Sequence, residues 1–393
     1  MTDVTVEPGS ILGVLGGGQL GAMFAAAARR LGYRIAVWDQ DPDAPAHRQS
    51  DHSFTAAFSD FPTREHFSSL VRAVTFEWEN VPADLCEWLE QRHLVRPSSA
   101  VLRIIQDRVE QKLFLQSHDL PVVPFVAIGA PDQLTEAVER IGIPVLCKTA
   151  TSGYDGKGQW PIRQNSDVDE VTRTLRTIEW PAFRWILEQL VEFERELSVL
   201  VVRGANGECL TYPVVENRHE RGILRMTLAP ATVSVQVAAR ASDLARQAVD
   251  VLKGVGVFCV ELFHTADDRL FINEIAPRPH NSGHYTLDAC TVSQFEQQVR
   301  AVCGAPLGEV RQWSPAAMVN LIGAEMQAVT SGQAFKELLS LPGTVLHLYG
   351  KKVVRPGRKM GHITFLGETR EAAAEPAHRL IARLAALSAV PPA

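Results

Sequence analysis

The stretches "VELF" (residues 260–263) and "INEIAPRPHNSGH" (residues 272–284) follow one another closely in the chain, and each carries one glutamate, Glu261 or Glu274. Both begin like buried strands, and the "TADDR" between them is typical of a turn, so we expect a β-hairpin. A hairpin brings the two carboxylates to the same end of a sheet, where they repel each other unless a cation lies between them. Mg²⁺ commonly binds one or two protein carboxylates and completes its coordination shell with phosphate oxygens and water. The pattern therefore predicts a Mg²⁺ site at these two glutamates.

A glycine-rich loop is expected upstream, in "CKTATSGYDGKGQ" (residues 147–159), directly after a strand that ends at Lys148. The loop contains three glycines and a second lysine: Gly153, Gly156, Gly158 and Lys157. Glycine lets backbone N–H groups approach an anion closely, and the lysine adds positive charge. The spacing is not that of a Walker A loop, so we interpret it as a loop that covers nucleotide phosphates, with a mobile hairpin as the alternative. If the sequence lacked this loop, solvated hairpin residues would be the better interpretation of Glu261 and Glu274. The loop favours a metal site.

Polar side chains come directly after Glu274, interleaved with prolines and a glycine: Arg278, His280, Asn281 and His284. Cationic and hydrogen-bonding groups next to a metal site are suited to hold a second anion or a phosphoryl group in transfer. For the histidines, and for His284 in particular, helix capping or packing is the alternative.

Two further charged stretches are candidates for substrate binding. In "FEREL" (residues 193–197), Glu194 and Glu196 share one face of a strand. An acid there either accepts hydrogen bonds from ribose hydroxyls or lies on an exposed strand edge. The stretch "KKVVRPGRKMGH" (residues 351–362) places five basic side chains among twelve residues of an otherwise acidic chain. Such a run is usually a solvated turn, and the alternative is proximity to a phosphorylated substrate.

The N-terminal stretch "GVLGGGQLG" (residues 13–21) has G-x-G-x-x-G spacing, formed by Gly16, Gly18 and Gly21. It follows an apolar run and opens an alanine-rich helical pattern that starts near Gln19. A second apolar run ends in Asp39, about twenty residues past the glycines, where a dinucleotide-binding unit has its ribose-binding acid. Taken alone, this stretch indicates NAD binding.

Short β-rich runs alternate with helical patterns from Ile11 to about Pro97, which predicts βαβ units and a mostly parallel sheet. A helix is expected over residues 101–118. In the middle of the chain, "RWILEQLVEF" (184–193) and "RELSVLVVRG" (195–204) are interpreted as paired antiparallel strands, and a long helix is expected over residues 234–252. The last section has strand-like runs and a closing helix.

We therefore predict a fold of α/β and α+β parts, because 393 residues exceed one compact core. The predicted divisions are an N-terminal dinucleotide-binding-like domain over residues 1–105, a central domain over 106–312 with a lid of about 120–185, and a small C-terminal α/β domain over 313–393.

Composition limits the function classes. The net charge of −6 argues against a basic nucleic-acid footprint, so we expect small molecules as partners and no nucleic acid. No apolar run approaches the length of a membrane span, and the N-terminus has no basic segment followed by an apolar one. The six cysteines lack C-x-x-C spacing and are interpreted as reduced thiols. These features predict a cytoplasmic protein that does not bind membranes.

Several motifs in this order resemble the 5-(carboxyamino)imidazole ribonucleotide synthases, ATP-grasp ligases of de novo purine synthesis. They are "GGGQLG", "FEWENV", "GYDGKGQ", "EFERELSV", "ENRH", "NEIAPRPHNSGH" and "RPGRKMGH", and they span nearly the whole chain. The resemblance implies an ATP-grasp fold preceded by a pre-ATP-grasp domain. It also implies a homodimer and a reaction of ATP, bicarbonate and 5-aminoimidazole ribonucleotide through carboxyphosphate. Two Mg²⁺ ions are expected, with Mn²⁺ as a possible replacement.

The resemblance also implies site residues. Those expected to bind ATP are Arg108, Lys148, Gly153, Tyr154, Asp155, Gly156, Lys157, Gly158, Gln159, Glu188, Gln189, Leu190, Val191, Glu196, His219, Asn273 and Glu274. The metal ligands would be Glu261 and Glu274, and the catalytic residues would be Asp155, Arg278, His280 and Asn281. Those expected at the ribonucleotide are Gly18, Gln19, Leu20, Glu77, Asn80, Tyr154, Lys352, Arg355 and Arg358. The glycine turn would then bind a single phosphate at a helix N-terminus.

Three alternatives remain open at this point. An NAD(P)-dependent oxidoreductase explains the first forty residues but not the loop after Lys148 or the two glutamates. A regulatory nucleotide-binding protein without catalysis does not require Arg278, His280 and both glutamates. A formate-using or biotin-carboxylating ATP-grasp ligase would share the fold and the metal site, and differs in the acceptor motifs "FEWENV" and "RPGRKMGH".

Overall fold

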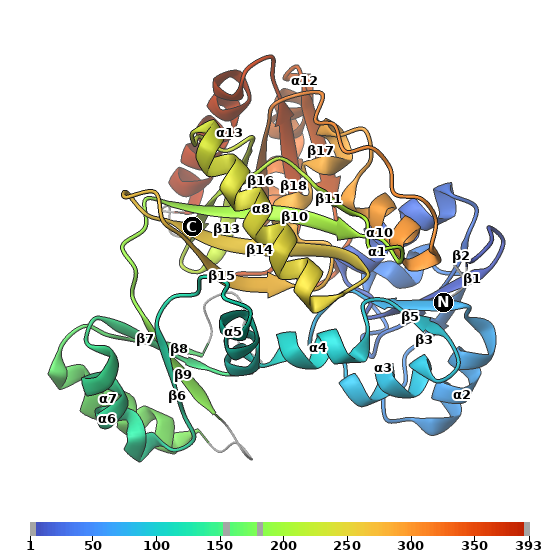
Figure 1. Ribbon diagram of the computed structural model, residues 1–393. Helices are drawn as coiled ribbons and strands as arrows, with labels where there is room; N and C mark the ends of the chain where they lie inside the picture. The colour runs from blue at the N-terminus through green and yellow to red at the C-terminus, as the bar shows by residue number, and fades with distance from the viewer. Residues whose placement is uncertain (1–4, 152–157, 179–183, 389–393) are drawn as a thin grey trace.

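The computed structural model describes residues 5–151, 158–178 and 184–388, which form three β-sheets with helices packed against them (Figure 1). The N-terminal sheet is parallel throughout and has the order β3-β2-β1-β4-β5, as the βαβ pattern predicts. Its strands are β1 (Ile11–Leu15), β2 (Arg34–Trp38), β3 (His52–Phe54), β4 (Ala73–Phe76) and β5 (Leu94–Val95). Its helices are α1 (Gln19–Arg30), η1 (Pro45–Gln49), α2 (Phe61–Leu70) and α3 (Ala83–Glu90). The order in which strands are added to the sheet reverses between β1 and β4, which are parallel neighbours. Sheets of this kind bind ligands at the carboxyl ends of the two strands where the order reverses.

The central sheet is antiparallel and has the order β15-β14-β10-β12-β13-β16-β18-β17, with β11 paired to β10. Its first strands are β10 (Arg195–Arg203), β11 (Cys209–Thr211), β12 (Val215–Glu220), β13 (Ile223–Ala229), β14 (Gly256–His264) and β15 (Leu270–Ala276). Helix α8 (Val235–Leu252) lies along these strands in Figure 1 and shares one hydrophobic cluster with them. Helix α10 (Gln294–Cys303) packs Phe295, Val299 and Val302 into the core of the N-terminal sheet, so the two sheets share buried apolar contacts.

The last section of the chain extends the central sheet. Its strands are β16 (Ala316–Ile322), β17 (Thr344–Leu348) and β18 (Lys359–Leu366). They continue the central sheet because β16 pairs with β13, β18 pairs with β16, and β17 pairs with β18, all antiparallel. Helices α11 (Glu325–Thr330), α12 (Gly332–Ser340) and α13 (Arg370–Ser388) accompany these strands. The division after residue 312 stays a prediction, and the ladder of backbone hydrogen bonds runs across it.

A third sheet of four antiparallel strands projects from the rest of the molecule (Figure 1). It contains β6 (Phe125–Ile128), β7 (Val145–Thr149), β8 (Gln159–Ile162) and β9 (Trp185–Gln189) in the order β6-β9-β7-β8, with η2 (Pro131–Gln133), α6 (Leu134–Ile141) and α7 (Asn165–Thr177). The predicted pairing of the runs 184–193 and 195–204 is wrong, because β9 pairs with β6 and β7 whereas β10 pairs with β14, β12 and β11. Both strands are apolar enough to be buried, and local sequence does not specify which neighbour a buried strand takes.

The helix expected over residues 101–118 is two helices, α4 (Ser99–Gln106) and α5 (Arg108–Ser117). The break falls at Asp107, whose Oδ1 accepts hydrogen bonds from the N–H groups of Val109 and Glu110 at 2.8 and 3.2 Å. An aspartate in extended conformation at this position is a favourable helix N-cap. Helix α5 therefore starts in a new direction, between the small sheet and the central sheet (Figure 1).

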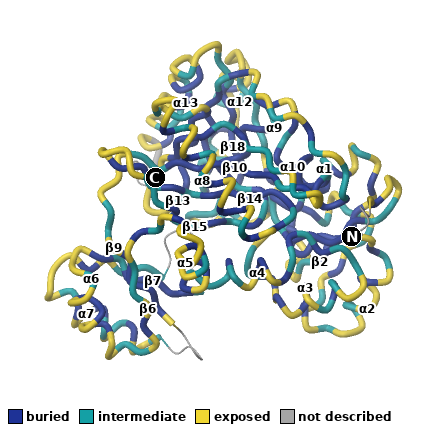
Figure 2. The backbone as a smooth tube through the Cα atoms, viewed as in Figure 1, coloured by how far each residue is buried: buried dark blue, intermediate teal, exposed yellow. Residues whose placement is uncertain are grey.

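Burial follows this arrangement. Figure 2 shows buried segments concentrated along the strands of the central and N-terminal sheets, with exposed segments on the outer helices. Among the described residues, no helix has both the length and the apolar character that a membrane span requires.

The core under α8 provides a stability prediction. Phe258 on β14 is fully buried in the cluster that α8 covers, so Phe258→Ala should lower the free energy of unfolding by about 3–5 kcal/mol through lost burial and a cavity. Urea unfolding followed by circular dichroism measures this change. Val235, the first residue of α8, is 81% exposed, and Val235→Ala should change the same free energy by less than about 0.5 kcal/mol. Equal unfolding midpoints for the two variants would contradict the packing described.

Candidate active site

Two facing carboxylates on β14 and β15 lie at the centre of the candidate site. Glu261 and Glu274 are direct cross-strand neighbours, so the predicted hairpin is confirmed. Burial and then the charge of Glu274 raise the pKa of Glu261 to about 7, because like charges at short range disfavour ionisation. A divalent cation between the carboxylates would remove this repulsion, and their oxygens are the donors that Mg²⁺ prefers.

The segment after β15 brings Arg278 and His280 next to the carboxylate pair. His280 Nε2 lies 3.5 Å from Glu261 Oε1, and His280 Nδ1 lies 2.9 Å from Ser282 Oγ. Burial and the charge of Arg278 hold the pKa of His280 well below its usual range, so this imidazole is neutral. Arg278 Nε donates a hydrogen bond of 2.6 Å to Glu79 Oε2. A guanidinium and a neutral imidazole beside a metal site are suited to bind an anion and to exchange hydrogen bonds with it.

Glu79 is a site residue that the sequence patterns do not single out. It lies two residues after Glu77, in the stretch from which the resemblance selects Glu77 and Asn80. Burial alone would raise the pKa of Glu79, but the charge and the hydrogen bond of Arg278 lower it. The available signal was the spacing of the two acids, because residues i and i+2 share one side of an extended chain. Through Glu79, the segment after β4 is joined to Arg278 in the segment after β15.

Asn281 belongs to a buried polar network. Its amide exchanges two hydrogen bonds with the amide of Asn320 on β16, at 2.6 and 3.0 Å. The neighbouring Ser282 Oγ accepts a hydrogen bond of 2.9 Å from Ser198 Oγ on β10. These bonds fix the short turn η3 (Asn281–Gly283) against two strands of the central sheet. A direct contact of Asn281 with bicarbonate stays a prediction.

Glu188 at the end of β9 lies between two lysines. Its Oε2 is 2.6 Å from Lys148 Nζ on β7, and its Oε1 is 3.2 Å from Lys112 Nζ on α5. Burial alone would raise the pKa of Glu188, but the charges of Lys112 and Lys148 outweigh burial and lower this pKa to about 2. Lys112 is 2% exposed and also donates to the carbonyl of Asn273 at 3.3 Å. It lies one helical turn after Arg108, on the helix that begins there, and the sequence patterns do not single it out.

Arg108 connects the small sheet with the carboxylate pair. Its Nη1 donates a hydrogen bond of 3.2 Å to the carbonyl of Thr149, the last residue of β7, and its Nη2 lies 3.9 Å from Glu274 Oε2. Gly158, on the far side of the predicted phosphate loop, has a φ of +69° and accepts the N–H of Thr149 through its carbonyl at 3.0 Å. Gln159 follows as the first residue of β8. The rest of the predicted loop lies outside the described residues: Gly153, Tyr154, Asp155, Gly156 and Lys157.

The connection from the small sheet to the central sheet contains the next predicted ATP residues. The N–H groups of Gln189 and Leu190 donate to the carbonyls of Pro124 and Pro144 at 2.9 and 3.0 Å, and Val191 follows in a half-buried position. On the central sheet, Glu196 Oε2 lies 2.7 Å from His219 Nδ1. Burial lowers the pKa of His219, but the hydrogen bond and charge of Glu196 raise it above its usual value. This pair therefore links β10 to β12 at the same end of the sheet as Glu261.

The glycine turn after β1 binds a carboxylate of its own chain. The N–H groups of Gly18 and Gly21 both donate to Glu77, the latter at 2.8 Å. Gly17 N–H donates to Asp39 Oδ2 at 2.6 Å, so the acid that a dinucleotide fold would use for ribose instead fixes the turn. A Cβ on Gly18 would come within 2.5 Å of Glu77 Oε1. The turn and Glu77 lie at the carboxyl ends of β1 and β4, with Gln19 and Leu20 opening α1 beside them.

The basic stretch between β17 and β18 lies against the N-terminal sheet. Lys352 Nζ forms an ion pair with Asp43, which follows β2. Lys351 Nζ donates to the carbonyl of Lys359 at 2.9 Å, and Arg358 Nη1 donates to the carbonyl of Val353 at 2.8 Å. Arg355 is exposed on the same turn, and Asn80 is half-buried after β4. The predicted ribonucleotide residue Lys352 thus contacts the N-terminal sheet region through Asp43, which is not among the predicted residues.

The fold and this arrangement define an ATP-grasp ligase. The chain matches the model of the ATP-grasp domain over residues 113–295, of the ribonucleotide synthetase preATP-grasp domain over 10–106, and of the phosphoribosylaminoimidazole carboxylase C-terminal domain over 316–376. These three models cover the chain in the order that the resemblance predicts.

Similar proteins narrow the class further. N5-carboxyaminoimidazole ribonucleotide synthase from Bacillus subtilis (strain 168) is 40% identical over 371 residues, 94% of this chain and 95% of that protein. The crystal structure of an ADP complex of N5-carboxyaminoimidazole ribonucleotide synthetase superimposes with a TM-score of 0.91 at 39% identity, covering 97% of this chain and 98% of that one. The synthase from Aspergillus clavatus in complex with ADP and 5-aminoimidazole ribonucleotide superimposes with a TM-score of 0.86 at 33% identity, covering 96% of this chain and 99% of that one.

This chain belongs to the N5-carboxyaminoimidazole ribonucleotide synthase family. The sequence-based predictions of an ATP-grasp fold and of an ATP-dependent ligase of purine biosynthesis are therefore confirmed.

The Glu188 site provides a second prediction. Glu188→Gln leaves Lys112 and Lys148 buried without their counter-ion, so the free energy of unfolding at pH 7 should fall by about 3–5 kcal/mol. Because the pKa of Glu188 is lowered on folding from the usual 4.5 to about 2, its stabilisation is complete above about pH 4.5 and is lost as the pH falls towards 2. Urea unfolding between pH 7 and pH 3 should therefore show a weaker acid dependence in the variant.

A matched control exists on α13, where Glu375 forms an exposed ion pair with Arg379 at 2.5 Å. Glu375→Gln should change the free energy of unfolding by no more than about 0.5 kcal/mol. If Glu188→Gln behaved like this control, the buried charge cluster would not stabilise the fold as described.

Proposed function

We propose that this chain carboxylates 5-aminoimidazole ribonucleotide with bicarbonate and ATP, giving N5-carboxyaminoimidazole ribonucleotide, ADP and phosphate. The observation that carries the proposal is the facing pair Glu261 and Glu274, with Arg278 in the segment that follows Glu274. Arg278 in turn donates a hydrogen bond to Glu79, which follows a strand of the N-terminal sheet. An ATP-dependent carboxylation needs a cation site, an anion site and an acceptor site next to one another. We assign the cation site to Glu261 and Glu274, the anion site to Arg278, and the acceptor site to the N-terminal sheet.

For nucleotide binding, we propose that Glu188 and the segment Gln189–Val191 hold the adenine end of ATP, and that Lys148 binds its phosphates. Glu196 would bind the ribose, because a carboxylate accepts hydrogen bonds from its hydroxyls, and His219 would line the nucleotide site beside it. Arg108 and the loop that ends at Gln159 would also hold the phosphates. In this loop, the glycines would contribute N–H groups and Lys157 would contribute positive charge.

For the metal, we propose Glu261 and Glu274 as ligands, with Asn273 next to them. Two Mg²⁺ ions, or Mn²⁺ in their place, would neutralise the ATP phosphates when bound. The donor set fits this role, because both ligands are carboxylates at directly paired positions of β14 and β15.

For the first chemical step, we propose that Arg278, His280 and Asn281 hold bicarbonate. A bicarbonate oxygen attacks the γ-phosphorus, the bond from the γ-phosphorus to the bridging oxygen breaks, and ADP leaves with carboxyphosphate remaining. Arg278 stabilises the charge on the transferring group, and the neutral His280 is able to accept the bicarbonate proton. Closure of the site by the small sheet would keep water from carboxyphosphate.

For the second step, we propose that the glycine turn and the basic stretch hold the ribonucleotide. Gly18, Gln19 and Leu20 would meet its phosphate at the N-terminus of α1, with Lys352, Arg355 and Arg358 adding positive charge. Glu77 and Asn80 would bind near the ring, and Tyr154 and Asp155 would lie between the two substrates. The exocyclic amine forms a bond to the carboxyl carbon of carboxyphosphate, or of the CO₂ it releases, as phosphate leaves and the amine loses a proton.

We also propose a cytoplasmic homodimer with domain boundaries after residues 105 and 312. Sedimentation would measure the oligomeric state. A formate-using or biotin-carboxylating activity has no specific support, because the acceptor motifs that would distinguish it match the ribonucleotide synthases.

ADP release from the purified protein with Mg-ATP and bicarbonate tests the proposal. We expect strong stimulation by 5-aminoimidazole ribonucleotide, with one ADP for each carboxylated product. Glu274→Gln should lower kcat by at least 100-fold, because it removes a charge from the metal site. Glu375→Gln, at an exposed acid of α13, serves as the control. ADP release with a different acceptor only, or a normal rate for Glu274→Gln, would overturn the assignment.

The acceptor site gives a separate prediction. Lys352→Ala should raise KM for the ribonucleotide about 10- to 100-fold while KM for ATP stays unchanged, because a charged hydrogen bond contributes about 1.5–3 kcal/mol. Arg379→Ala is a matched control, since the side chains of Lys352 and Arg379 are 61% and 63% exposed. Equal changes in both KM values would show that Lys352 does not act at the acceptor site.

A further inference from the structure

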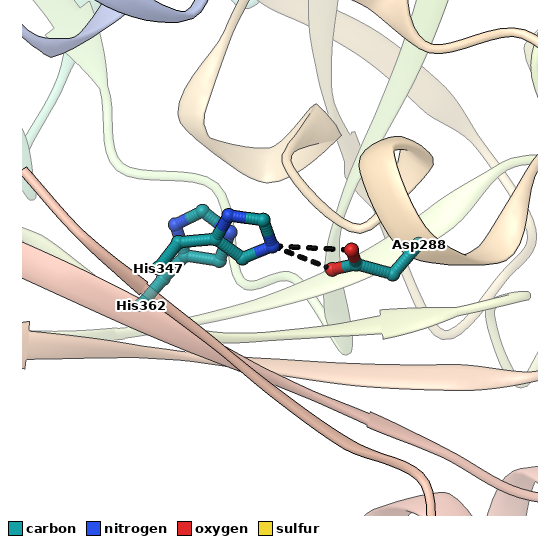
Figure 3. A group of neighbouring side chains, drawn as sticks. All are labelled: Asp288, His347 and His362. Carbon is teal, nitrogen blue, oxygen red and sulfur yellow. Dashed lines mark hydrogen bonds and ion pairs between the residues drawn. The ribbon is translucent and has the colours of Figure 1, made fainter.

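A cluster of histidines and one aspartate lies outside the site described above. Asp288 is on α9 (Thr286–Ala289), His347 is on β17, and His362 is its direct cross-strand neighbour on β18. His347 Nε2 lies 3.0 and 3.1 Å from the two carboxylate oxygens of Asp288. Figure 3 shows His347 pointing at Asp288, with the ring of His362 behind it. One ligand atom from each of the three residues lies within 4.8 Å of the other two.

His362 presents a nitrogen that its surroundings leave unused. The residue is fully buried, and its Nδ1 lies 2.9 Å from the hydroxyl of Tyr349. Its Nε2 has no hydrogen-bond partner within the part of the chain that the structure describes. A buried polar atom without a partner costs about 1–3 kcal/mol, so a ligand at Nε2 would remove this penalty.

The hydrogen bond at the other nitrogen of His362 also suits a metal ligand. Metal-bound histidines commonly use their second nitrogen for a hydrogen bond that orients the ring. The hydroxyl of Tyr349 occupies that position at His362 Nδ1.

We propose that Asp288, His347 and His362 bind one divalent transition metal ion of the Zn²⁺ class, with water as the remaining ligand. Two imidazole nitrogens and one carboxylate oxygen form a ligand set that suits Zn²⁺. Tetrahedral Zn²⁺ with bonds of about 2.0–2.2 Å has neighbouring ligand atoms roughly 3.3 Å apart. The separation of 3.0–3.1 Å between His347 and Asp288 is already close to this value.

Binding requires a change at one ring. The rings of His347 and His362 are stacked at 4.5 Å with 14° between their planes, and lone pairs in parallel planes do not converge on one ion. The side chain of His347 is 28% exposed, so its ring has room to turn about the Cβ–Cγ bond, whereas His362 stays fixed by Tyr349. The exposed edge of His347 also provides the entry path for the ion.

The position of the site explains what such an ion would do. Helix α9 comes directly after the segment that holds Arg278 and His280, and β17 leads into the basic stretch with Lys352. An ion bound by α9, β17 and β18 would tie these two segments together. Its ligand set of two imidazoles and one carboxylate would differ from the two carboxylates proposed for Mg²⁺.

Cobalt binding to the full-length, chelator-treated protein tests the proposal. The titration uses the Glu274→Gln variant as background, which removes a ligand of the other cation site. We expect one Co²⁺ per chain, a visible absorption band of a site with nitrogen ligands, displacement by Zn²⁺, and a rise in Tm when Zn²⁺ is added.

Variants then assign the ligands. His347→Gln and Asp288→Asn should each weaken Co²⁺ binding more than about 100-fold, and Tyr349→Phe should weaken it about 10-fold, as expected for an outer-shell partner. His378→Gln, at an exposed histidine of α13, should leave binding unchanged. His347 is partly exposed, so its variant should fold even if a variant of the buried His362 does not.

Two results would overturn the proposal. The first is an absence of Co²⁺ and Zn²⁺ binding at millimolar concentration in the protein with all three ligands. The second is binding that persists in His347→Gln and Asp288→Asn, which would leave the cluster as an ion pair between Asp288 and His347 only.

Discussion

Like charges directly opposite each other on paired strands are destabilising, and the central sheet places Glu261 and Glu274 in that position. The surrounding structure partly compensates this repulsion, with Arg108 near Glu274 and His280 near Glu261. Neither contact neutralises the pair, because Arg108 is 3.9 Å away and the imidazole of His280 is neutral. Burial and the charge of Glu274 raise the pKa of Glu261 to about 7, so protonation of Glu261 removes the repulsion as the pH falls below this value.

The three sheets meet at this hairpin through a few polar contacts between distant parts of the chain. Glu79 and Arg278 join the N-terminal and central sheets, and Lys112 and Glu188 join α5 to the small sheet. The contact of Lys112 with Glu188 is a buried charge pair, and that of Arg278 with Glu79 is half-buried. Removal of one buried partner leaves a charge without its counter-ion. Such pairs specify geometry more than they add stability, which suits a site whose substrates come from separate sheets.

The glycine turn shows why a local motif was ambiguous. Its spacing fits a dinucleotide fold, and the strand order and the parallel pairing fit as well. The N–H groups of Gly18 and Gly21 nevertheless bind Glu77, and Asp39 binds Gly17. These two carboxylates reduce the positive potential that the turn offers to any phosphate group, whether a pyrophosphate or a single phosphate. The contact between Lys352 and Asp43 adds a cation beside this turn, and it comes from the far end of the sequence.

The sequence by itself determined the class of fold, the hairpin with its two glutamates, and most of the residues proposed for the site. The class of fold and the hairpin follow from periodicity and turn residues, which are local properties of the chain. Most of the proposed site residues follow instead from the resemblance of the chain's motifs to a known family. Only the tertiary structure decided that β9 and β10 belong to different sheets, that the last strands extend the central sheet, and that Glu79 and Lys112 join the site. It also brought Asp288, His347 and His362 together. The physical reason is that strand pairing and buried charge pairs depend on partners far away in the sequence, whereas helices, turns and strand periodicity depend on neighbouring residues.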